Sequence, residues 1–234
     1  MPDQIVIERR FRGPTESGNG GYTCGLVAAF VTGPAEVTLR VPPPLDRPLE
    51  VARDDGVVRA LDEGRVVAEG KPAGVALEVP DPPSFEQAAA AALPEGDLES
   101  PFPECFVCGA QRSLDDGLRI FAGPLGEGLV AATWVPAESH QAPEFVWAAL
   151  DCPGAYAGGF GVGERGTLVL GRLAAMVDAI PRAGEPCVVV GWPLGEEGRK
   201  VYAGTALYGE GGRLLGRARA TWIQPLSLAG TAGV

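Results

Sequence analysis

Hydrophobic and polar residues alternate with a period of two in many short segments of this 234-residue chain, and that period predicts β-strands. The predicted strands cover residues 5–9, 37–41, 49–53, 57–61 and 65–69 in the first part of the chain and residues 168–179, 186–192, 201–208 and 213–223 in the second. Asp62, Glu63 and Gly64 form a hairpin signal between two of them. A further hairpin is expected from residues 118–121 and 129–135.

The last predicted strand, residues 213–223, has two distinct faces. Leu214, Gly216, Ala218, Ala220 and Trp222 share one face, and Arg213, Arg217, Arg219 and Thr221 share the other. The small residues of the first face would allow a helix to lie close against the sheet. The arginines of the second face are expected to meet solvent or a partner.

Two segments, residues 22–31 and 145–157, are apolar on almost every face and are predicted to form buried helices. Pro143 stands where the first turn of the second helix tolerates proline, whereas Pro153 makes the course of that helix ambiguous. A third, shorter helix is predicted within residues 84–93, because Ser84 with Gln87 three residues later forms a capping-box pattern.

The third helix lies in a proline-rich segment, residues 71–104, that we interpret as a linker. Proline cannot donate a hydrogen bond to a sheet, so the linker is expected to cover a face or an edge without adding an interior strand. It separates two halves, residues 1–70 and 105–225, in each of which one apolar helix precedes a run of antiparallel strands. The chain is therefore predicted to be an α+β protein built from two tandem halves.

The net charge of −11 excludes some partners. An acidic chain repels the phosphates of nucleic acids and an anionic membrane surface, so neither is expected as a partner. The longest apolar run, residues 26–31, is far shorter than the ~20 residues of a membrane-spanning helix, and the first ten residues have no signal-peptide pattern. We therefore expect a soluble cytoplasmic protein, and the sequence leaves its oligomeric state open, a homo-oligomer included.

The chain has five cysteines, of which Cys105 and Cys108 form a lone C-x-x-C pattern. An odd number without a secretory signal argues against a disulfide framework. A tetrahedral zinc site usually needs four ligands, and only His140 and three scattered cysteines remain to complete one. The favoured interpretation is a reduced turn with two small apolar side chains and no metal or cofactor, with metal or redox chemistry as the alternative.

Several motifs occur in an order that resembles the hotdog thioesterase superfamily in its tandem, double-hotdog form. Residues 19–22 (Asn-Gly-Gly-Tyr) look like the start of the central helix, and residues 148–151 look like the helix segment that carries an acidic residue. Residues 105–109 and 117–120 look like the segment leading into the first long hairpin, and residues 211–222 look like the last strand pair. The resemblance implies a double-hotdog fold and acyl-CoA thioesterase chemistry, or a non-catalytic acyl-binding or scaffold relative.

The resemblance also implies a site. Thioester hydrolysis needs N–H donors that polarise the carbonyl and a carboxylate that activates water or attacks the carbon directly. Gly20 and Gly21 at the start of the first helix supply the donors, with Asn19 beside them, and Asp151 is the carboxylate. The plainer interpretations are that Asn19 only caps the helix and that Asp151 caps a helix near Pro153 or faces water.

Four further residues are candidates for substrate binding. Tyr22 follows the two glycines, Glu144 is a second candidate carboxylate, and Arg199 and Lys200 at a predicted turn could contact the phosphates of coenzyme A. Glu144 is equally explained by the preference for acids in a first helical turn, and the two basic residues by protection of a strand edge. His140, the only histidine, is interpreted as a surface or packing residue.

The two halves depart from the family pattern in different ways. The first half has the two glycines but Ala28 at the acidic position, whereas the second half has Asp151 but Ala-Pro-Glu at its helix start, residues 142–144. Pro143 has no N–H to donate. We therefore expect one competent site per chain, where the glycines of one half meet Asp151 of the other, and one vestigial site at Pro143 and Ala28.

Overall fold

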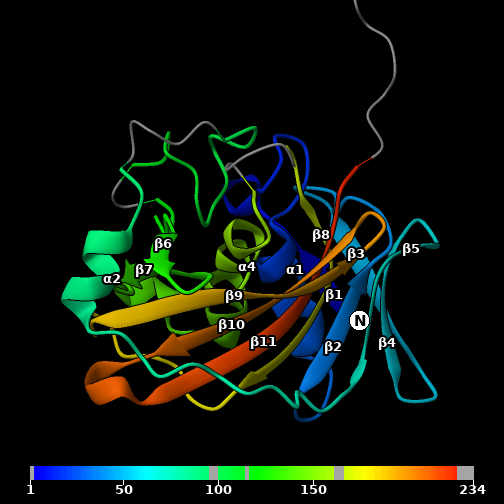
Figure 1. The fold of residues 1–234 in the computed structure, drawn as a ribbon. Coiled ribbons are helices and arrows are strands. Elements are labelled where there is room, and N and C mark those ends of the chain that lie inside the picture. The colour runs from blue at the N-terminus through cyan, green and yellow to red at the C-terminus, as the bar shows by residue number, and fades with distance from the viewer. Residues whose placement is uncertain (1–2, 95–99, 114–115, 161–165, 226–234) are drawn as a thin grey trace, which may run out of the picture.

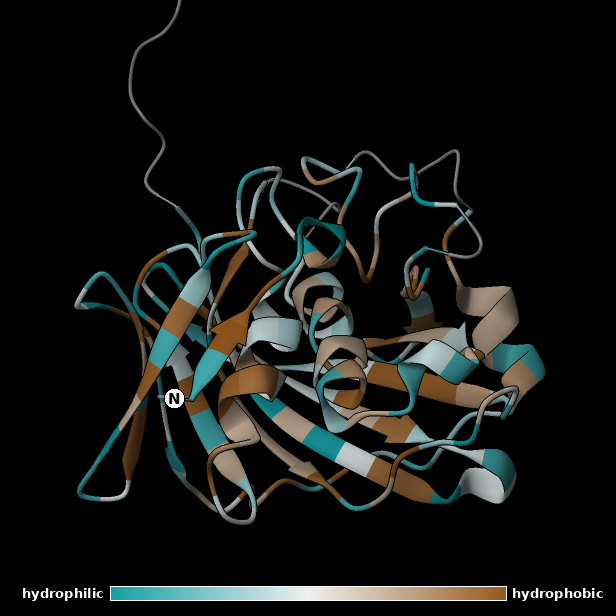
Figure 2. Cartoon of the chain, turned by 180° about the vertical axis from the view of Figure 1, so that it is seen from behind, coloured by the Kyte–Doolittle hydropathy of each residue, from teal (hydrophilic) through white to brown (hydrophobic). Residues whose placement is uncertain are grey.

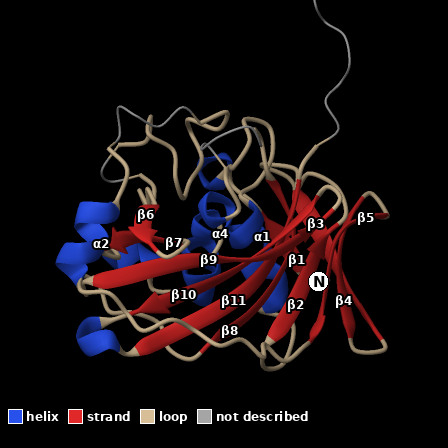
Figure 3. Cartoon of the chain, in the orientation of Figure 1, coloured by secondary structure: helices blue, strands red, loops and turns tan. Residues whose placement is uncertain are grey.

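The computed structural model describes residues 3–94, 100–113, 116–160 and 166–225. Its strands are β1 (Gln4–Val6), β2 (Ala35–Leu39), β3 (Pro48–Asp54), β4 (Val57–Asp62), β5 (Arg65–Pro72), β6 (Gly123–Gly126), β7 (Leu129–Trp134), β8 (Val169–Val177), β9 (Cys187–Glu197), β10 (Lys200–Tyr208) and β11 (Leu214–Ile223). They form one sheet in the order β1-β3-β4-β5-β2-β8-β11-β10-β9-β7-β6, drawn in red in Figure 3. All pairs of neighbouring strands are antiparallel.

The helices are α1 (Gly20–Ala28), α2 (Phe85–Ala91), α3 (Pro143–Ala149) and α4 (Cys152–Ala157), with short 3-10 helices at Arg9–Phe11, Glu138–His140 and Glu210–Gly212. The sheet curves around α1 and α4, and α2 lies at one side of the molecule (Figure 1). Within the described residues, no helix is both long enough and apolar enough to cross a membrane.

The sheet is continuous between the two parts of the chain because β2 pairs with β8. Val37 lies opposite Leu173 in this pair, and both side chains are fully buried. The strands before residue 73 therefore share one sheet with those after residue 122. Bands of hydrophobic and hydrophilic residues alternate along many of the strands in Figure 2, which is the period-two pattern from which the strands were predicted.

The last strand confirms the prediction of two faces over most of its length. Gly216, Ala218, Ala220 and Trp222 of β11 are buried, whereas Arg219 is exposed. The short side chains leave room for the helices that pack on the buried face, as the pattern predicted.

A close crossing of α1 and α3 depends on two glycines one helical turn apart. A Cβ atom on Gly21 would lie 2.5 Å from Cβ of Asp151, and a Cβ atom on Gly25 would lie 2.5 Å from Cα of Glu144. Neither distance is possible for a real side chain, so this approach of the two helices requires glycine at both positions. The crossing also brings the start of α1 against the end of α3.

The single helix predicted over residues 145–157 is wrong, because the structure has two helices, α3 and α4, that break at Leu150 and Asp151. Pro153 lies in the first turn of α4. The N–H groups of a first turn make no hydrogen bond within the helix, so proline is tolerated there. The hydroxyl of Thr205 on β10 donates to the carbonyl oxygen of Leu150 at 2.8 Å, which satisfies a carbonyl at the break.

The first strand of the predicted 118–121/129–135 hairpin is also wrong. The strand that pairs with β7 is β6, Gly123–Gly126. The apolar residues 118–121 instead bond to the preceding loop, because the N–H groups of Leu118 and Ile120 donate to the carbonyls of Phe106 and Val107 at 2.8 and 2.9 Å.

The linker helix has the predicted capping box. Ser84 Oγ accepts from the Gln87 N–H at 3.2 Å, and Gln87 Oε1 accepts from the Ser84 N–H at 2.8 Å. Ala88 of α2 packs against Ala131 and Val190, on the face of the sheet opposite to α4. Residues 73–94 and 100–104 contain no strand, although β5 itself extends to Pro72, and residues 95–99 lie outside the described part.

A buried carboxylate fixes the turn between β10 and β11. Glu185 accepts hydrogen bonds from the N–H groups of Arg182 (2.9 Å) and Glu210 (3.1 Å) and from the guanidinium of Arg213 (3.0 Å). Burial alone would raise the pKa of Glu185, but these donors outweigh it and hold the pKa below its usual range.

Candidate functional site

Asp151, at the break between α3 and α4, contacts the start of α1. Its side chain is 2% exposed, and Oδ2 accepts hydrogen bonds from the Gly21 N–H at 2.9 Å and from Asn19 Nδ2 at 3.0 Å. Burial raises the pKa of Asp151 to about 7, against the lowering effect of these two hydrogen bonds. The structure therefore brings Asp151 into direct contact with Gly21, which lies 130 residues earlier in the chain.

Asn19 has two partners at the start of α1. Its Oδ1 accepts from the Tyr22 N–H at 2.9 Å, which makes it the cap of the helix, while its amide nitrogen donates to Asp151. The Gly21 N–H is already used by Asp151, whereas the Gly20 N–H has no partner among the described residues. Of the two glycines, Gly20 therefore offers the free N–H donor.

A cavity of about 290 Å³ opens beside these residues. Asn19, Gly20 and Asp151 line it together with Leu39, Phe102, Cys105, Cys108, Cys152, Tyr156, Phe160, Leu168, Leu170, Trp222 and Ile223, among others. Asp151 Oδ1 and Trp222 Nε1 are buried without a hydrogen-bond partner in the described part of the chain. Such atoms usually mark the position of a water or a ligand, so the cavity combines apolar walls with unsatisfied polar groups.

Three cysteines in the wall of this cavity form a cluster that the sequence analysis did not assemble. The sulfur atoms of Cys105, Cys108 and Cys152 all lie within 4.8 Å of one another, and Cys105 is 3.9 Å from Cys152. The C-x-x-C pair was visible as a motif, but Cys152 joins it only through the fold. Hydrogen bonds from Cys108 and Cys152, and from the N–H groups of Cys108 and Val107, hold the pKa of the Cys105 thiol well below its usual range.

The four residues predicted to bind substrate are not among the described residues that line this cavity. Tyr22 is buried and stacks on Phe11, with ring centres 4.1 Å apart. Glu144 packs beside Gly25 at the helix crossing. Arg199 donates to a backbone carbonyl at 3.1 Å and Lys200 lies 3.9 Å from a glutamate, both at the turn between β9 and β10.

His140 is a packing residue, as one of the two sequence interpretations had it. It is buried against the ring of Phe145 at 4.9 Å, and burial lowers its pKa. It is not among the residues lining the Asp151 cavity. An Asp-His pair is therefore not assembled there.

A second cavity of about 620 Å³ lies at the other end of the helix pair. Ala28 and Pro143 line it, which is the pairing expected for the vestigial site. Asp178 also lines it, but its carboxylate pairs with Arg217 at 3.4 Å. At this cavity the helix start offers a proline in place of an N–H donor.

No protein-family model matches the sequence, and no curated protein matches it. Solved structures do match. A pyran synthase domain from module nine of the sorangicin pathway has a TM-score of 0.64 at 15% identity, covering 96% of this chain and 92% of that one. A hot dog fold protein from Alicyclobacillus acidocaldarius has a TM-score of 0.59 at 11% identity, covering 95% and 92%. The acyl-CoA thioesterase II TesB2 from Mycobacterium marinum has a TM-score of 0.55 at 14% identity, covering 97% and 94%.

These similarities show the fold of the chain. The proteins differ in what they are named for, and their identities to this chain are low, so the shared property is the hotdog architecture itself. The prediction of a hotdog fold similar to that of thioesterases is confirmed.

Proposed function

We propose that this hotdog-fold chain hydrolyses an acyl thioester in the cavity at the start of α1, with Asp151 as the base or nucleophile. One observation carries the proposal: a fully enclosed carboxylate stands at the N-terminus of the central helix, in the wall of a largely apolar cavity. A buried carboxylate costs several kcal/mol where it lacks partners, and Asp151 Oδ1 has no hydrogen-bond partner among the described residues. A perturbed acid of this kind in the wall of a cavity is typical of a functional site.

The Gly20 N–H is the donor that we assign to the thioester carbonyl. It is the free donor at the start of α1, and the dipole of this nine-residue helix favours the negative charge that develops on the carbonyl oxygen. The Gly21 N–H then has a different task, because with Asn19 it holds the carboxylate of Asp151 in place. Gly20 thus polarises the thioester carbonyl, while Gly21 positions the carboxylate of Asp151.

The walls of the cavity fit the acyl group of the substrate. Phe102, Phe160, Leu168 and Leu170 supply apolar surface, so we propose an apolar acyl chain. Coenzyme A is the proposed thiol carrier. Its phosphates would lie outside the cavity, near the turn that carries Arg199 and Lys200, since Lys200 pairs with Ile223 and Ile223 lines the cavity.

We also propose that the fold is a double hotdog with residues 1–70 and 105–225 as its halves, and that only one of its two sites is competent. The site with Gly20, Gly21 and Asp151 has both a donor and an acid. Among the described residues that line the cavity at Ala28 and Pro143, the helix start offers Pro143 in place of an N–H donor, and the one carboxylate, on Asp178, is paired with an arginine. One acyl ligand per chain follows from this asymmetry.

A specific observation favours a second candidate, an acyl-ligand binder or scaffold without catalysis. Asp151 Oδ2 already accepts two hydrogen bonds, and a carboxylate whose main task is to tie α4 to α1 would show the same contacts. In that case the cavity binds an acyl group but does not turn it over. The two candidates differ in the release of free thiol.

The experiment compares Asp151→Asn with Asp178→Asn, the same change in the other cavity. Both variants and the wild type are screened against acyl-CoA thioesters of several chain lengths and the corresponding N-acetylcysteamine thioesters, with free thiol detected. We expect Asp151→Asn to lower kcat by at least roughly 10²-fold, the usual scale for a lost general base, and Asp178→Asn to leave kcat unchanged.

Several outcomes decide between the candidates. Near-wild-type turnover in a folded Asp151→Asn protein removes Asp151 from the mechanism. A wild-type protein that hydrolyses none of the thioesters but binds one acyl-CoA per chain is the acyl-ligand binder. Equal turnover of the N-acetylcysteamine and coenzyme A thioesters contradicts the assignment of phosphate contacts to Arg199 and Lys200. Two equivalent ligand sites per chain contradict the asymmetry.

A further inference from the structure

We propose that Cys105, Cys108 and Cys152 bind a zinc ion, with a fourth coordination position open to the cavity beside Asp151. This inference is independent of the proposed hydrolysis, because it rests on the three thiols and not on the carboxylate. It replaces the interpretation of the C-x-x-C motif as a reduced turn with no metal.

The spacing of the sulfur atoms fits a tetrahedral zinc site. All three lie within 4.8 Å of one another, and the Cys105–Cys152 separation is 3.9 Å. With zinc–sulfur bonds of about 2.3 Å and tetrahedral angles, two thiolates on one ion lie about 3.8 Å apart. The cluster therefore needs only small side-chain movements to enclose an ion.

The loop that carries the first two cysteines is a tight turn that closes immediately after Cys108. The Gly109 N–H donates to the Cys105 carbonyl at 2.8 Å, and a Cβ atom on Gly109 would lie 2.5 Å from that same oxygen. The tight turn therefore requires glycine immediately after the second cysteine.

The third ligand comes from a different part of the chain. Cys152 follows Asp151 at the helix break, 44 residues after Cys108 in the sequence, and all three cysteines are buried. All three line the cavity. Three protein ligands with the fourth position facing a cavity is the arrangement of zinc sites that keep a water or take up a ligand, whereas purely structural sites have four protein ligands.

A disulfide between Cys105 and Cys152 is the competing use of these residues. It would oxidise two thiols to one S–S bond, would need an external oxidant to accept two electrons and two protons, and would leave Cys108 beside it without a role. A metal site uses all three sulfurs and needs no oxidant. A count of free thiols distinguishes the two. A disulfide lowers the count by two, whereas zinc-bound cysteines all react as free thiols once a chelator has removed the metal.

The test uses the 234-residue chain, purified without chelators, and measures its zinc content by elemental mass spectrometry. Metal-free protein is then loaded with Co²⁺, whose thiolate charge-transfer absorption reports sulfur ligation. We expect one metal per chain and a charge-transfer band. Cys105→Ala, Cys108→Ala and Cys152→Ala should each lower metal affinity, by at least about 10-fold by analogy with the cost of disturbing metal-site partners.

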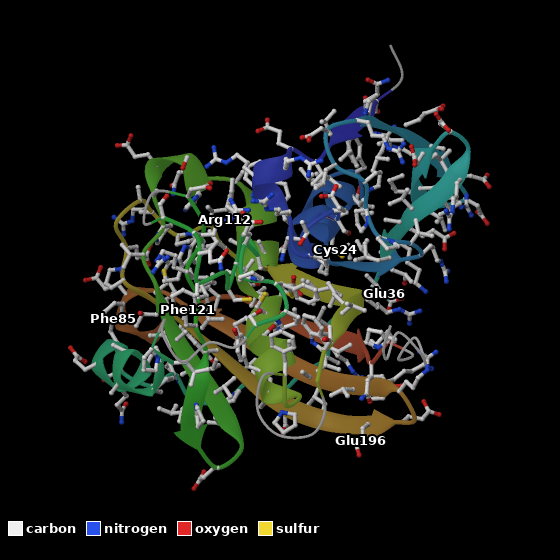
Figure 4. All side chains as sticks on the ribbon, turned by 90° about the horizontal axis from the view of Figure 1, so that it is seen from above. Cys24, Glu36, Phe85, Arg112, Phe121 and Glu196 are labelled. Carbon is white, nitrogen blue, oxygen red and sulfur yellow. The ribbon has the colours of Figure 1, made fainter. Side chains whose placement is uncertain are left out.

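Cys24→Ala and Cys187→Ala are the matched controls, because both cysteines are buried but neither belongs to the cluster. Cys24 lies on α1 (Figure 4) and Cys187 on β9. These two variants should bind zinc as the wild type does. If the cluster variants do not fold, the wild-type cobalt spectrum decides on its own. Absence of a thiolate–cobalt band in the folded, reduced wild type overturns the proposal, as does a Cys105–Cys152 disulfide found in the purified protein.

Discussion

Replacing Gly25 with alanine tests whether the close crossing of α1 and α3 holds the two halves of the site together. The added Cβ atom would lie 2.5 Å from Cα of Glu144 and 3.0 Å from Cβ of Trp147, whereas ordinary Cβ contacts begin at 3.4 Å. Because the nearest obstacle is a backbone atom, it cannot rotate away, and the helices must separate by about 1 Å.

The magnitude follows from two opposing effects. Overpacking a core costs about 1–3 kcal/mol, and a backbone clash belongs at or above the upper end of that range. Replacing a helical glycine with alanine returns about 1 kcal/mol of helix propensity. We therefore expect Gly25→Ala to lower the free energy of unfolding by about 2 kcal/mol, which lowers Tm by about 4–8 °C in a chain of this size.

The assay is thermal and urea unfolding of Gly25→Ala beside Gly74→Ala. Gly74 has a φ that other residues adopt, and a Cβ atom there would meet nothing within 4 Å, so its replacement should leave stability unchanged or slightly higher. A Gly25→Ala protein as stable as the wild type would refute the reasoning, because it would mean that the helices do not approach as closely as the structure shows.

Two further predictions concern groups outside the cavity. Glu185→Gln should lower stability by about 1–3 kcal/mol at neutral pH. Because the folded-state pKa of Glu185 lies below its ordinary 4.5, the stability difference between wild type and variant should be complete above pH 4.5 and should fade as the pH falls through the folded pKa. Urea unfolding across pH measures this difference, and a stability difference that grows toward acid pH would contradict the prediction. Thr205→Val should cost about 1–3 kcal/mol, since it leaves the Leu150 carbonyl without its 2.8 Å hydrogen bond, and unchanged urea unfolding would contradict that role.

Much of the fold could be predicted from local patterns. The hairpin of β4 and β5 was readable from alternation on both sides of an Asp-Glu-Gly turn, and the capping box of Ser84 located α2. The β6 strand was not readable, because Gly-Pro-Leu-Gly has no strand pattern and its place at the edge of the sheet is set by pairing with β7. The strand was predicted at residues 118–121 because they are more hydrophobic, but their N–H groups form hydrogen bonds with a loop.

The candidate site could be predicted only in part. The glycines and Asp151 were found through the order of the motifs, and the structure places them in contact. Pro153 marked the course of the second helix as ambiguous, but the break at Leu150 and Asp151 was not predicted. The hydrogen bond that satisfies the Leu150 carbonyl comes from Thr205, which lies 55 residues after Leu150. Cys152 was missed because no local pattern relates it to a C-x-x-C motif 44 residues before it.

The dipeptide Asp151-Cys152 links the proposed catalytic and zinc sites. Asp151 faces the start of α1, and Cys152 faces the loop that carries Cys105. Asn19 contacts the acid and one thiol of the cluster, because its Nδ2 lies 3.0 Å from Asp151 Oδ2 and 3.7 Å from the sulfur of Cys105. The N-cap of α1, the acid and the thiol cluster therefore form one contiguous buried network. If the thiol cluster binds zinc as proposed, a change in metal occupancy would act on the position of Asp151 through neighbouring atoms.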